Sequence, residues 1–309
     1  MKKYLCFLLC FVIVFCAGCG KVEKSEEVVR ENLEITQEKI IIGENVKKGD
    51  SVKVPILLFH HFSESSNDSS VIKVSNFELH IKTLLENGYN TVTVTDLWNY
   101  VYNGVKLPKN PICITFDDGY LSNYEIAFPI LQKYNAKATI FVIGSSVGKK
   151  KYKETDYGII EHFTWEQANE MINSGLVDIQ SHTWDMHQWY EFEEKDKSEI
   201  RVNMLRLNNE TDEEYINYLK NDCQNMNKVF QENLGYIPKA IAYPGGKYDN
   251  FVEKNVVDCG IDITLNTFED VSTIVSGEKE SLIGLNRINV DNNMTSKKLL
   301  NFLKSCLMK

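Results

Sequence analysis

Short apolar runs that alternate with helix-period segments constrain the fold of this chain more than any other feature. From Val52 onward, runs such as Val54–Phe59, Ile112–Phe116 and Ala138–Ile143 are separated by segments with apolar residues at helical spacing. This alternation predicts an α/β domain with a largely parallel sheet. The stretch is long enough for one hydrophobic core, so we expect a single domain over residues 51–309.

The segments between these runs carry helix signals. Thr95 is expected to cap a helix over Asp96–Tyr102, and Thr164 with Gln167 three residues later predicts a capping box. The charged stretch Glu191–Glu214 predicts a solvated insertion. Further strands are expected at Thr91–Val94, Val177–Gln180, Ala240–Tyr243, Ile263–Asn266 and Leu285–Val290.

The amino-terminal residues predict export. A cationic start precedes the apolar stretch Tyr4–Phe15, which is too short to span a bilayer as a stable helix. With Ala17-Gly18-Cys19, the pattern resembles a bacterial lipoprotein signal over residues 1–18 and a lipidated Cys19, although Cys16 stands where such signals usually carry an aliphatic residue. A secretory signal or an uncleaved anchor are the alternatives. In each case we expect an extracytoplasmic protein, and a lipoprotein would be held to the bacterial membrane through Cys19.

The exported part of the chain is acidic. Residues 19–50 are charged and poor in aromatics, which predicts a solvated tether, with a surface helix as the alternative. Loss of residues 1–18 would remove two lysines and lower the formal charge from -9 to -11. No basic stripe remains, so we expect no nucleic-acid partner. The four cysteines after Cys19 have the spacing of neither a CxxC metal site nor a dense disulfide framework.

Two polar segments that follow predicted strands carry the chemistry. Thr115–Gly119 reads TFDDG, and Ser181–His187 reads SHTWDMH. In parallel α/β architectures, this edge of the sheet is where ligands bind. Two imidazoles and one carboxylate form a facial ligand set for a divalent metal of the zinc or iron type, which leaves a second carboxylate free to act as a base. Either segment alone is typical of a turn or surface loop, but their combination favours a metal site.

These segments, followed by Ala242–Gly246 (AYPGG), resemble in order the first three motifs of the polysaccharide deacetylases, carbohydrate esterase family 4. The similarity runs from about Pro55 to Val290. Within the family, Leu58–Phe62 (LFHHF) is similar to the early Tyr-His segment of the poly-β-1,6-N-acetylglucosamine deacetylases. The resemblance implies a deformed (β/α) barrel with fewer strands than the regular eightfold form.

The resemblance also implies roles for single residues. Asp118, His182 and His187 would bind a divalent metal, zinc above all, with Co²⁺, Ni²⁺ or Fe²⁺ as alternatives. Asp117 would be the general base, and the main-chain N–H of Gly245 would stabilise the oxyanion. The implied reaction is hydrolysis of N-acetyl groups on an N-acetylglucosamine-containing polysaccharide.

The chain departs from the family pattern at two places. No histidine follows His187, where most members carry a late catalytic acid. The poly-N-acetylglucosamine branch takes the acid from the early segment, which points to His60, with His61 as the alternative. Ala242 stands where many members carry an arginine that orients the base. Arg287 is our hypothesis for its replacement, with a surface or structural ion pair as the alternative.

Other expectations remain open at this level. His80 and His162 are expected to take no part in the site. A non-catalytic glycan-binding lipoprotein is the competing class, and peptidoglycan or O-acetylated xylan are rival substrates. Several aromatic residues gather around the motifs and predict either core packing or a glycan groove: Trp184, Trp189, Tyr190, Tyr243 and Tyr248.

Overall fold

The computed structural model describes residues 46–65, 68–193 and 196–308. The predicted signal over residues 1–18 and most of the predicted tether, residues 19–45, lie outside the described residues. The end of that tether packs on the domain, because Val46 N–H donates to the Gly104 carbonyl at 3.0 Å and Gly49 N–H donates to the Ser276 carbonyl at 2.8 Å. Within the described residues, the helices are all too short or too polar to cross a membrane.

The main sheet is parallel and curls into a deformed barrel. In the described residues it has eight strands, in the order β10-β2-β4-β5-β6-β7-β8 with β3 paired to β4. An isolated parallel bridge between Leu265 and Leu285 links the last strand to the segment that leads into β10. Seven of these strands lie on the ring, one fewer than in the regular eightfold form, because β3 pairs with β4 alone. The expected deformed barrel is therefore confirmed. The strands are β2 (Ile56–Phe59), β3 (Asn90–Val92), β4 (Pro111–Phe116), β5 (Ala138–Val142), β6 (Val177–Ser181), β7 (Ala240–Ala242), β8 (Ile263–Leu265) and β10 (Ile288–Asn289).

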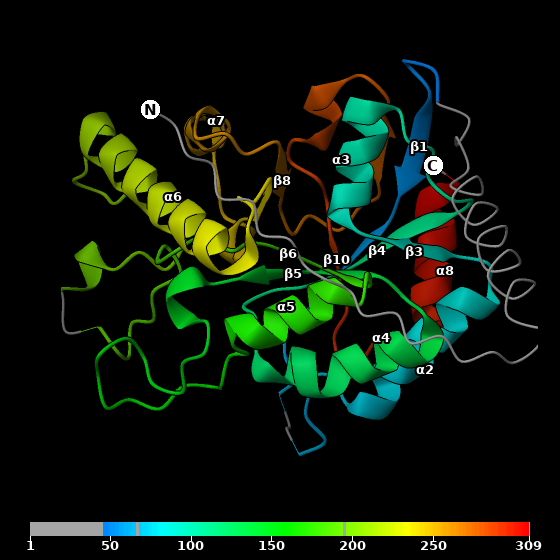
Figure 1. The fold of residues 1–309 in the computed structure, drawn as a ribbon, viewed down its shortest axis with the longest axis horizontal. Coiled ribbons are helices and arrows are strands. Elements are labelled where there is room, and N and C mark those ends of the chain that lie inside the picture. Colours follow the sequence, from blue (N-terminus) through cyan, green and yellow to red (C-terminus); the bar gives the residue numbers. More distant parts are fainter. Residues whose placement is uncertain (1–45, 66–67, 194–195, 309) are drawn as a thin grey trace, which may run out of the picture. The chain divides into compact units, whose positions relative to one another are not determined.

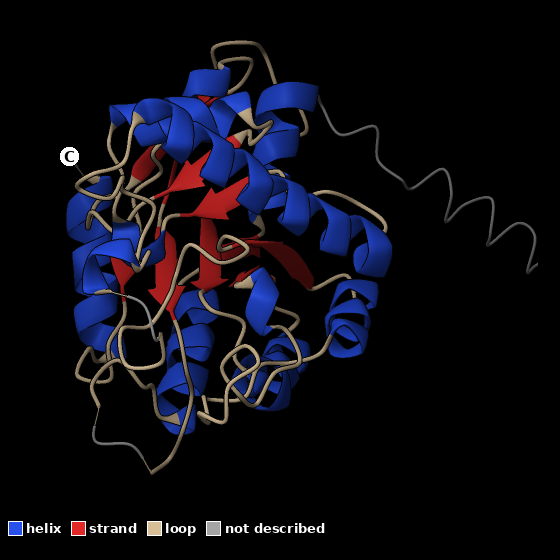
Figure 2. Ribbon diagram, turned by 90° about the vertical axis from the view of Figure 1, so that its left-hand side faces the viewer, coloured by secondary structure: helices blue, strands red, loops and turns tan. Residues whose placement is uncertain are grey.

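Helices enclose the strands, as Figure 2 shows. They are α2 (Val74–Glu86), α3 (Val94–Asn103), α4 (Phe128–Tyr134), α5 (Trp165–Asn173), α6 (Asp212–Leu234), α7 (Asn250–Asp258) and α8 (Ser296–Leu307). Helices α4 and α5 lie on the opposite side of the strands from α3 (Figure 1). Because both faces of the strands are covered, β4 and β5 are buried at every position, which explains their uninterrupted apolar sequence. A separate antiparallel pair joins β1 (Ser51–Val54) to β9 (Ser272–Val275).

One predicted cap is wrong and one is confirmed. Helix α3 begins after Thr93, whose hydroxyl accepts from Asp96 N–H while the Asp96 carboxylate accepts from Thr93 N–H. Thr95 lies inside the helix, and its hydroxyl donates to Asp178 at 2.9 Å. Asp96 completes a capping box only with the residue three positions before it, so the cap falls on Thr93. The capping box of Thr164 is present as expected.

The charged stretch Glu191–Glu214 is largely exposed or half-buried in its described residues, as expected of a solvated insertion, but it is also anchored to the domain. Ile200 and Met204 are buried within it. Arg201 is 5% exposed; its guanidinium pairs with Glu210 and lies 4.0 Å from the ring centroid of Tyr218 in α6. One pair of these charges, Arg201 and Glu210, therefore packs against α6 instead of facing solvent.

Candidate active site

The carboxyl ends of β4 and β6 place the two polar segments side by side. Asp117 directly follows β4, and its N–H donates to the Phe59 carbonyl of β2 at 3.0 Å. His182 directly follows β6, and its N–H donates to the Val142 carbonyl of β5 at 2.8 Å. The hydrogen bonds of the sheet thus continue one residue beyond β4 and β6, and they fix the backbone positions of Asp117 and His182.

Asp118, His182 and His187 converge on one point. One ligand atom from each lies within 4.8 Å of the others. The Oδ1 atom of Asp118 lies 3.5 Å from His182 Nε2 and 3.8 Å from His187 Nε2. Ligands about 2.0 Å from a tetrahedral zinc ion would stand roughly 3.3 Å apart. In the described residues, Asp118 Oδ1 is buried without a hydrogen-bond partner, which a cation at this point would supply. The three residues therefore fit a divalent metal.

The main chain fixes the tautomers of both histidines. Nδ1 of His182 lies 2.8 Å from the Ala242 carbonyl, and Nδ1 of His187 lies 3.0 Å from the Val202 carbonyl. A carbonyl oxygen can only accept, so Nδ1 carries the proton and Nε2 presents its lone pair to the metal point. Burial lowers the pKa of His182 against the opposing effect of the two aspartates, which keeps this imidazole neutral.

The turn after β4 needs a strained backbone and a glycine. Asp118 has a φ of 70°, which non-glycine residues rarely adopt, and Gly119 has a φ of 81°. A Cβ atom on Gly119 would lie 2.9 Å from Cγ1 of Val142 in β5. The glycine of TFDDG thus lets the turn pass close to the sheet while the Asp118 carboxylate turns toward the histidines.

Asp117 is held by Arg287. The guanidinium donates to both carboxylate oxygens, with Nη1 to Oδ1 at 2.6 Å and Nη2 to Oδ2 at 2.8 Å, and its Nε donates to the Asn266 carbonyl at 2.9 Å. The arginine side chain is 0% exposed, so this is no surface ion pair. Burial would raise the pKa of Asp117, but Arg287 and then His182 lower it to about 2. Asp117 is therefore an ionised, oriented carboxylate at neutral pH.

A cavity of about 360 Å³ opens over these groups. It is lined by Leu58, His60, Asp117, Asp118, His182, His187, Gly245, Thr267 and Asn289. Arg287 stands behind Asp117. His61 turns away, because its Nδ1 lies 2.8 Å from Ser122 Oγ and its ring packs edge-on against Tyr120. Of the two adjacent histidines, His60 is thus the one that lines the cavity together with the metal trio, Asp118, His182 and His187.

Comparison with known families accounts for this arrangement. Residues 104–264, just over half of the 309-residue chain, match the model of the polysaccharide deacetylases. The chain belongs to the polysaccharide deacetylase family. The match spans the aspartate turn, the histidine segment and Gly245. This family membership makes the protein a deacetylase-type hydrolase.

Individual relatives agree with the family. YxkH of Bacillus subtilis, whose name assigns it to the polysaccharide deacetylases, is 29% identical over 260 residues, which cover 84% of this chain and 79% of that one. A poly-beta-1,6-N-acetyl-D-glucosamine N-deacetylase of Staphylococcus aureus is 29% identical over 65% of this chain and 62% of its own length. A de-N-acetylase structure from Aggregatibacter actinomycetemcomitans has a TM-score of 0.67 at 22% identity, over 81% of this chain and 100% of that one, and shares its fold.

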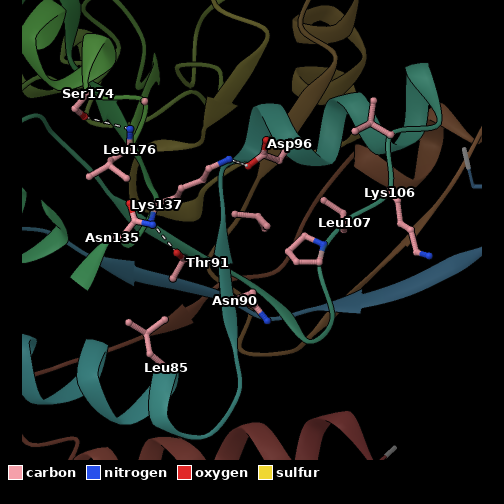
Figure 3. Close-up of a pocket in the computed structure, with 14 residues that line it drawn as sticks. Leu85, Asn90, Thr91, Asp96, Lys106, Leu107, Asn135, Lys137, Ser174 and Leu176 are labelled. Carbon is pink, nitrogen blue, oxygen red and sulfur yellow. Dashed lines mark hydrogen bonds and ion pairs between the residues drawn. The ribbon is translucent and has the colours of Figure 1, made fainter. Parts of the chain in front are cut away.

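A larger cavity, of about 510 Å³, is not the deacetylase site. Its walls come largely from residues at or just before the amino ends of β3, β5 and β6 (Figure 3). The metal trio, in contrast, follows the carboxyl ends of strands. Lys137, directly before β5, donates its N–H to Thr91 Oγ1 at 2.7 Å and its Nζ to Asp96 at 3.0 Å there. These polar groups are satisfied by one another, and the candidate site residues of the deacetylase motifs lie at the other edge of the sheet.

Sequence reasoning missed Asp222. This residue supports the metal loop of this deacetylase, which is the segment His182–His187. Its carboxylate, buried in α6, accepts from the N–H groups of Trp184 and Asp185 at 2.8 and 2.7 Å. Burial raises its pKa to about 7, against the lowering effect of these two hydrogen bonds. The signal is a single acid on an otherwise apolar helical stripe, Tyr215, Leu219, Met226 and Phe230.

The histidines and tyrosines that remain make packing contacts outside the cavity. His80 is buried, and its Nδ1 lies 3.0 Å from Ser296 Oγ, so this side chain connects α2 to α8. His162 is buried against the Tyr120 ring. Neither lines the deacetylase cavity. Tyr243 is fully buried, and the partly buried Tyr248 stacks on it with ring centroids 4.5 Å apart, so both rings pack on the core.

Proposed function

We propose that this protein is a zinc-dependent N-deacetylase that removes acetyl groups from N-acetylglucosamine residues of an extracellular or cell-envelope polysaccharide. One observation carries the proposal: three metal-ligand atoms converge beside an ionised Asp117 in an open cavity. Poly-β-1,6-N-acetylglucosamine is the polymer we favour, because the LFHHF segment and the Staphylococcus aureus relative both point to it. Export and anchoring through Cys19 belong to the same proposal.

The side chains of the cavity divide the work of hydrolysis. A divalent cation held by Asp118, His182 and His187 would lower the pKa of a bound water and polarise the acetamide carbonyl. Asp117 accepts the proton of the attacking water, and Arg287 keeps both carboxylate oxygens in position. Gly245 lines the cavity with a φ of 59° and offers its N–H to the developing oxyanion. His60 donates a proton to the departing amine.

Replacing His60 with Asn should therefore affect amide substrates more than activated esters. An amine leaves only when protonated, whereas an aryl oxide needs no acid. We expect kcat on an N-acetylglucosamine oligomer to fall on the order of 100-fold. Hydrolysis of an aryl acetate should change little, and His61→Asn is the matched control. An equal loss on both substrates, or a larger loss in His61→Asn, would remove His60 from the role of acid.

Acetate release from defined glycans tests the proposed function. The purified full-length protein is incubated with β-1,6-linked and β-1,4-linked N-acetylglucosamine oligomers and with acetylated xylan. We expect acetate and free amine to appear from the β-1,6-linked oligomers, to stop after a chelator removes the metal, and to return when Zn²⁺ is added.

The other outcomes are equally informative. Oligomer binding without acetate release, with or without Zn²⁺, would make the protein a glycan-binding module. Release that is faster from β-1,4-linked oligomers would move the substrate to peptidoglycan-type glycans. Release that persists after complete metal removal would contradict the role of the three ligands.

A further inference from the structure

Two cysteines meet where α6 packs on α7. Cys223 lies in α6, and Cys259 directly follows the last residue of α7. Both side chains pack against one hydrophobic cluster, which includes Tyr215, Leu219 and Val256. The Cys223 thiol donates a hydrogen bond to the Cys259 sulfur. Two helices that are distant in the sequence thus bring two free thiols into direct contact.

Neighbouring charges place Cys259 at the same turn of α6. The hydrogen bond from Cys223 lowers the pKa of Cys259 most, against the opposing effect of burial. The charge of Lys220 lowers this pKa further, and the charge of Asp222 raises it. Lys220, Asp222 and Cys223 lie on one turn of the helix, so three side chains of α6 act on the same thiol.

The contact divides the two thiols into a nucleophile and a resolving group. The hydrogen bond that favours the Cys259 thiolate raises the pKa of Cys223, which stays protonated as the donor. A thiolate is the form that attacks a disulfide, and neither member of the pair is fully buried. Cys113 and Cys306, the other free cysteines of the described residues, are buried. An external disulfide would therefore react at Cys259 first.

We propose that Cys223 and Cys259 are a redox-active pair that closes to a disulfide and links α6 to α7. The oxidant is a low-molecular-weight disulfide. The Cys259 thiolate forms a bond to one sulfur of that disulfide and expels the other sulfur as a thiolate. Cys223 then loses its proton, forms the bond to the Cys259 sulfur and expels the second small thiolate. The protein loses two electrons and two protons, which the two released small thiols carry.

The link would connect two elements that support the deacetylase cavity. Asp222, directly before Cys223, accepts from two N–H groups of the metal loop. Helix α7 follows the turn that contains Gly245, which lines the cavity. The export that we propose would place the pair in an oxidising compartment, where disulfides persist. Formation of the disulfide itself does not depend on the proposed reaction.

Mass spectrometry of the purified full-length protein tests the pair. The folded protein is equilibrated with reduced and oxidised glutathione, the remaining thiols are alkylated in denaturant, and the digest is analysed for joined peptides. We expect most molecules to carry the Cys223–Cys259 link. The midpoint of thermal unfolding should rise by about 5–10 °C relative to protein treated with a reductant.

Two variants accompany the wild type. Cys259→Ser keeps the size of the side chain but removes the nucleophile, so both the link and the rise in the unfolding midpoint should be lost. Cys306→Ser is the matched control, because Cys306 packs in α8 away from the pair, and it should retain both. The wild-type measurement decides the matter even if Cys259→Ser folds poorly.

Three results would overturn the inference. They are the absence of the joined peptide at equilibrium, a joined peptide without a rise in the unfolding midpoint, and equal amounts of links from Cys223 or Cys259 to other cysteines. None of these measurements uses acetate release, so they are separate from the proposed function. A linked and stabilised protein that released no acetate would keep the disulfide and remove the reaction.

Discussion

Replacing Asp117 with asparagine is expected to lower kcat about a thousandfold without loss of bound metal. Asparagine has nearly the same shape but cannot accept the proton of the attacking water. The proposed metal ligands are Asp118, His182 and His187, so metal content should stay at the wild-type level. The measurement pairs acetate release with metal analysis of the same preparation.

The matched control is Asp262→Asn. Asp262 also accepts two side-chain hydrogen bonds, from Trp98 at 2.7 Å and Tyr102 at 2.9 Å, but it precedes β8 at the other edge of the sheet. The kcat of the Asp262→Asn enzyme should remain close to the wild-type value. An Asp117→Asn enzyme that keeps more than a tenth of the wild-type kcat would show that another group acts as the base.

Replacing Arg287 with methionine is expected to lower the free energy of unfolding by about 3–5 kcal/mol. The guanidinium is 0% exposed and the Asp117 side chain is 4% exposed, so the change leaves an uncompensated carboxylate in the interior. Urea unfolding at neutral pH measures the loss. Arg206→Met is the control, because the Arg206–Asp212 pair is 37% and 65% exposed and should contribute about 1 kcal/mol or less.

The acid side of the stability profile gives a second readout of this pair. In the wild type, the pKa of Asp117 is lowered from its ordinary 3.8 to about 2. Its stabilising contribution is therefore fully present above about pH 4 and is lost as the pH falls toward 2. Without Arg287, burial raises this pKa, so the penalty of Arg287→Met should shrink as the pH is lowered. A penalty that is small or grows toward acid pH would contradict the structural role of the pair.

Arg287→Lys separates orientation of the base from stability. Lysine keeps a charge beside Asp117 but cannot hold both carboxylate oxygens in the fork that a guanidinium makes. Turnover should fall while metal content stays intact. Unchanged turnover would remove Arg287 from the catalytic arrangement.

Much of the fold and the metal trio is predictable because local sequence patterns carry them. Buried parallel strands produce apolar runs, and the residues directly after such runs share one edge of the sheet. Asp118 and His182 are each adjacent to a strand end, so their meeting follows from topology. The capping box at Thr164 is likewise local in sequence.

The features that the sequence left open or missed depend on contacts between distant segments. Arg287 and Asp117 are 170 residues apart, and sequence alone leaves a surface pair as a rival explanation. The sequence places Asp222 on the apolar stripe of α6, but its two main-chain donors, Trp184 and Asp185, lie in a distant segment. Arg201 looks solvated because its partner Glu210 and the ring of Tyr218 are not evident from charge density.

The main-chain support of the two ligand histidines leaves room for sequence drift. Every residue type supplies a carbonyl, so substitutions at Ala242 or Val202 do not remove the acceptors that hold His182 and His187. An evolving chain can therefore exchange the side chain at position 242 without loosening the ligands. The exchange matters for Asp117, whose partner Arg287 comes here from the segment directly before β10.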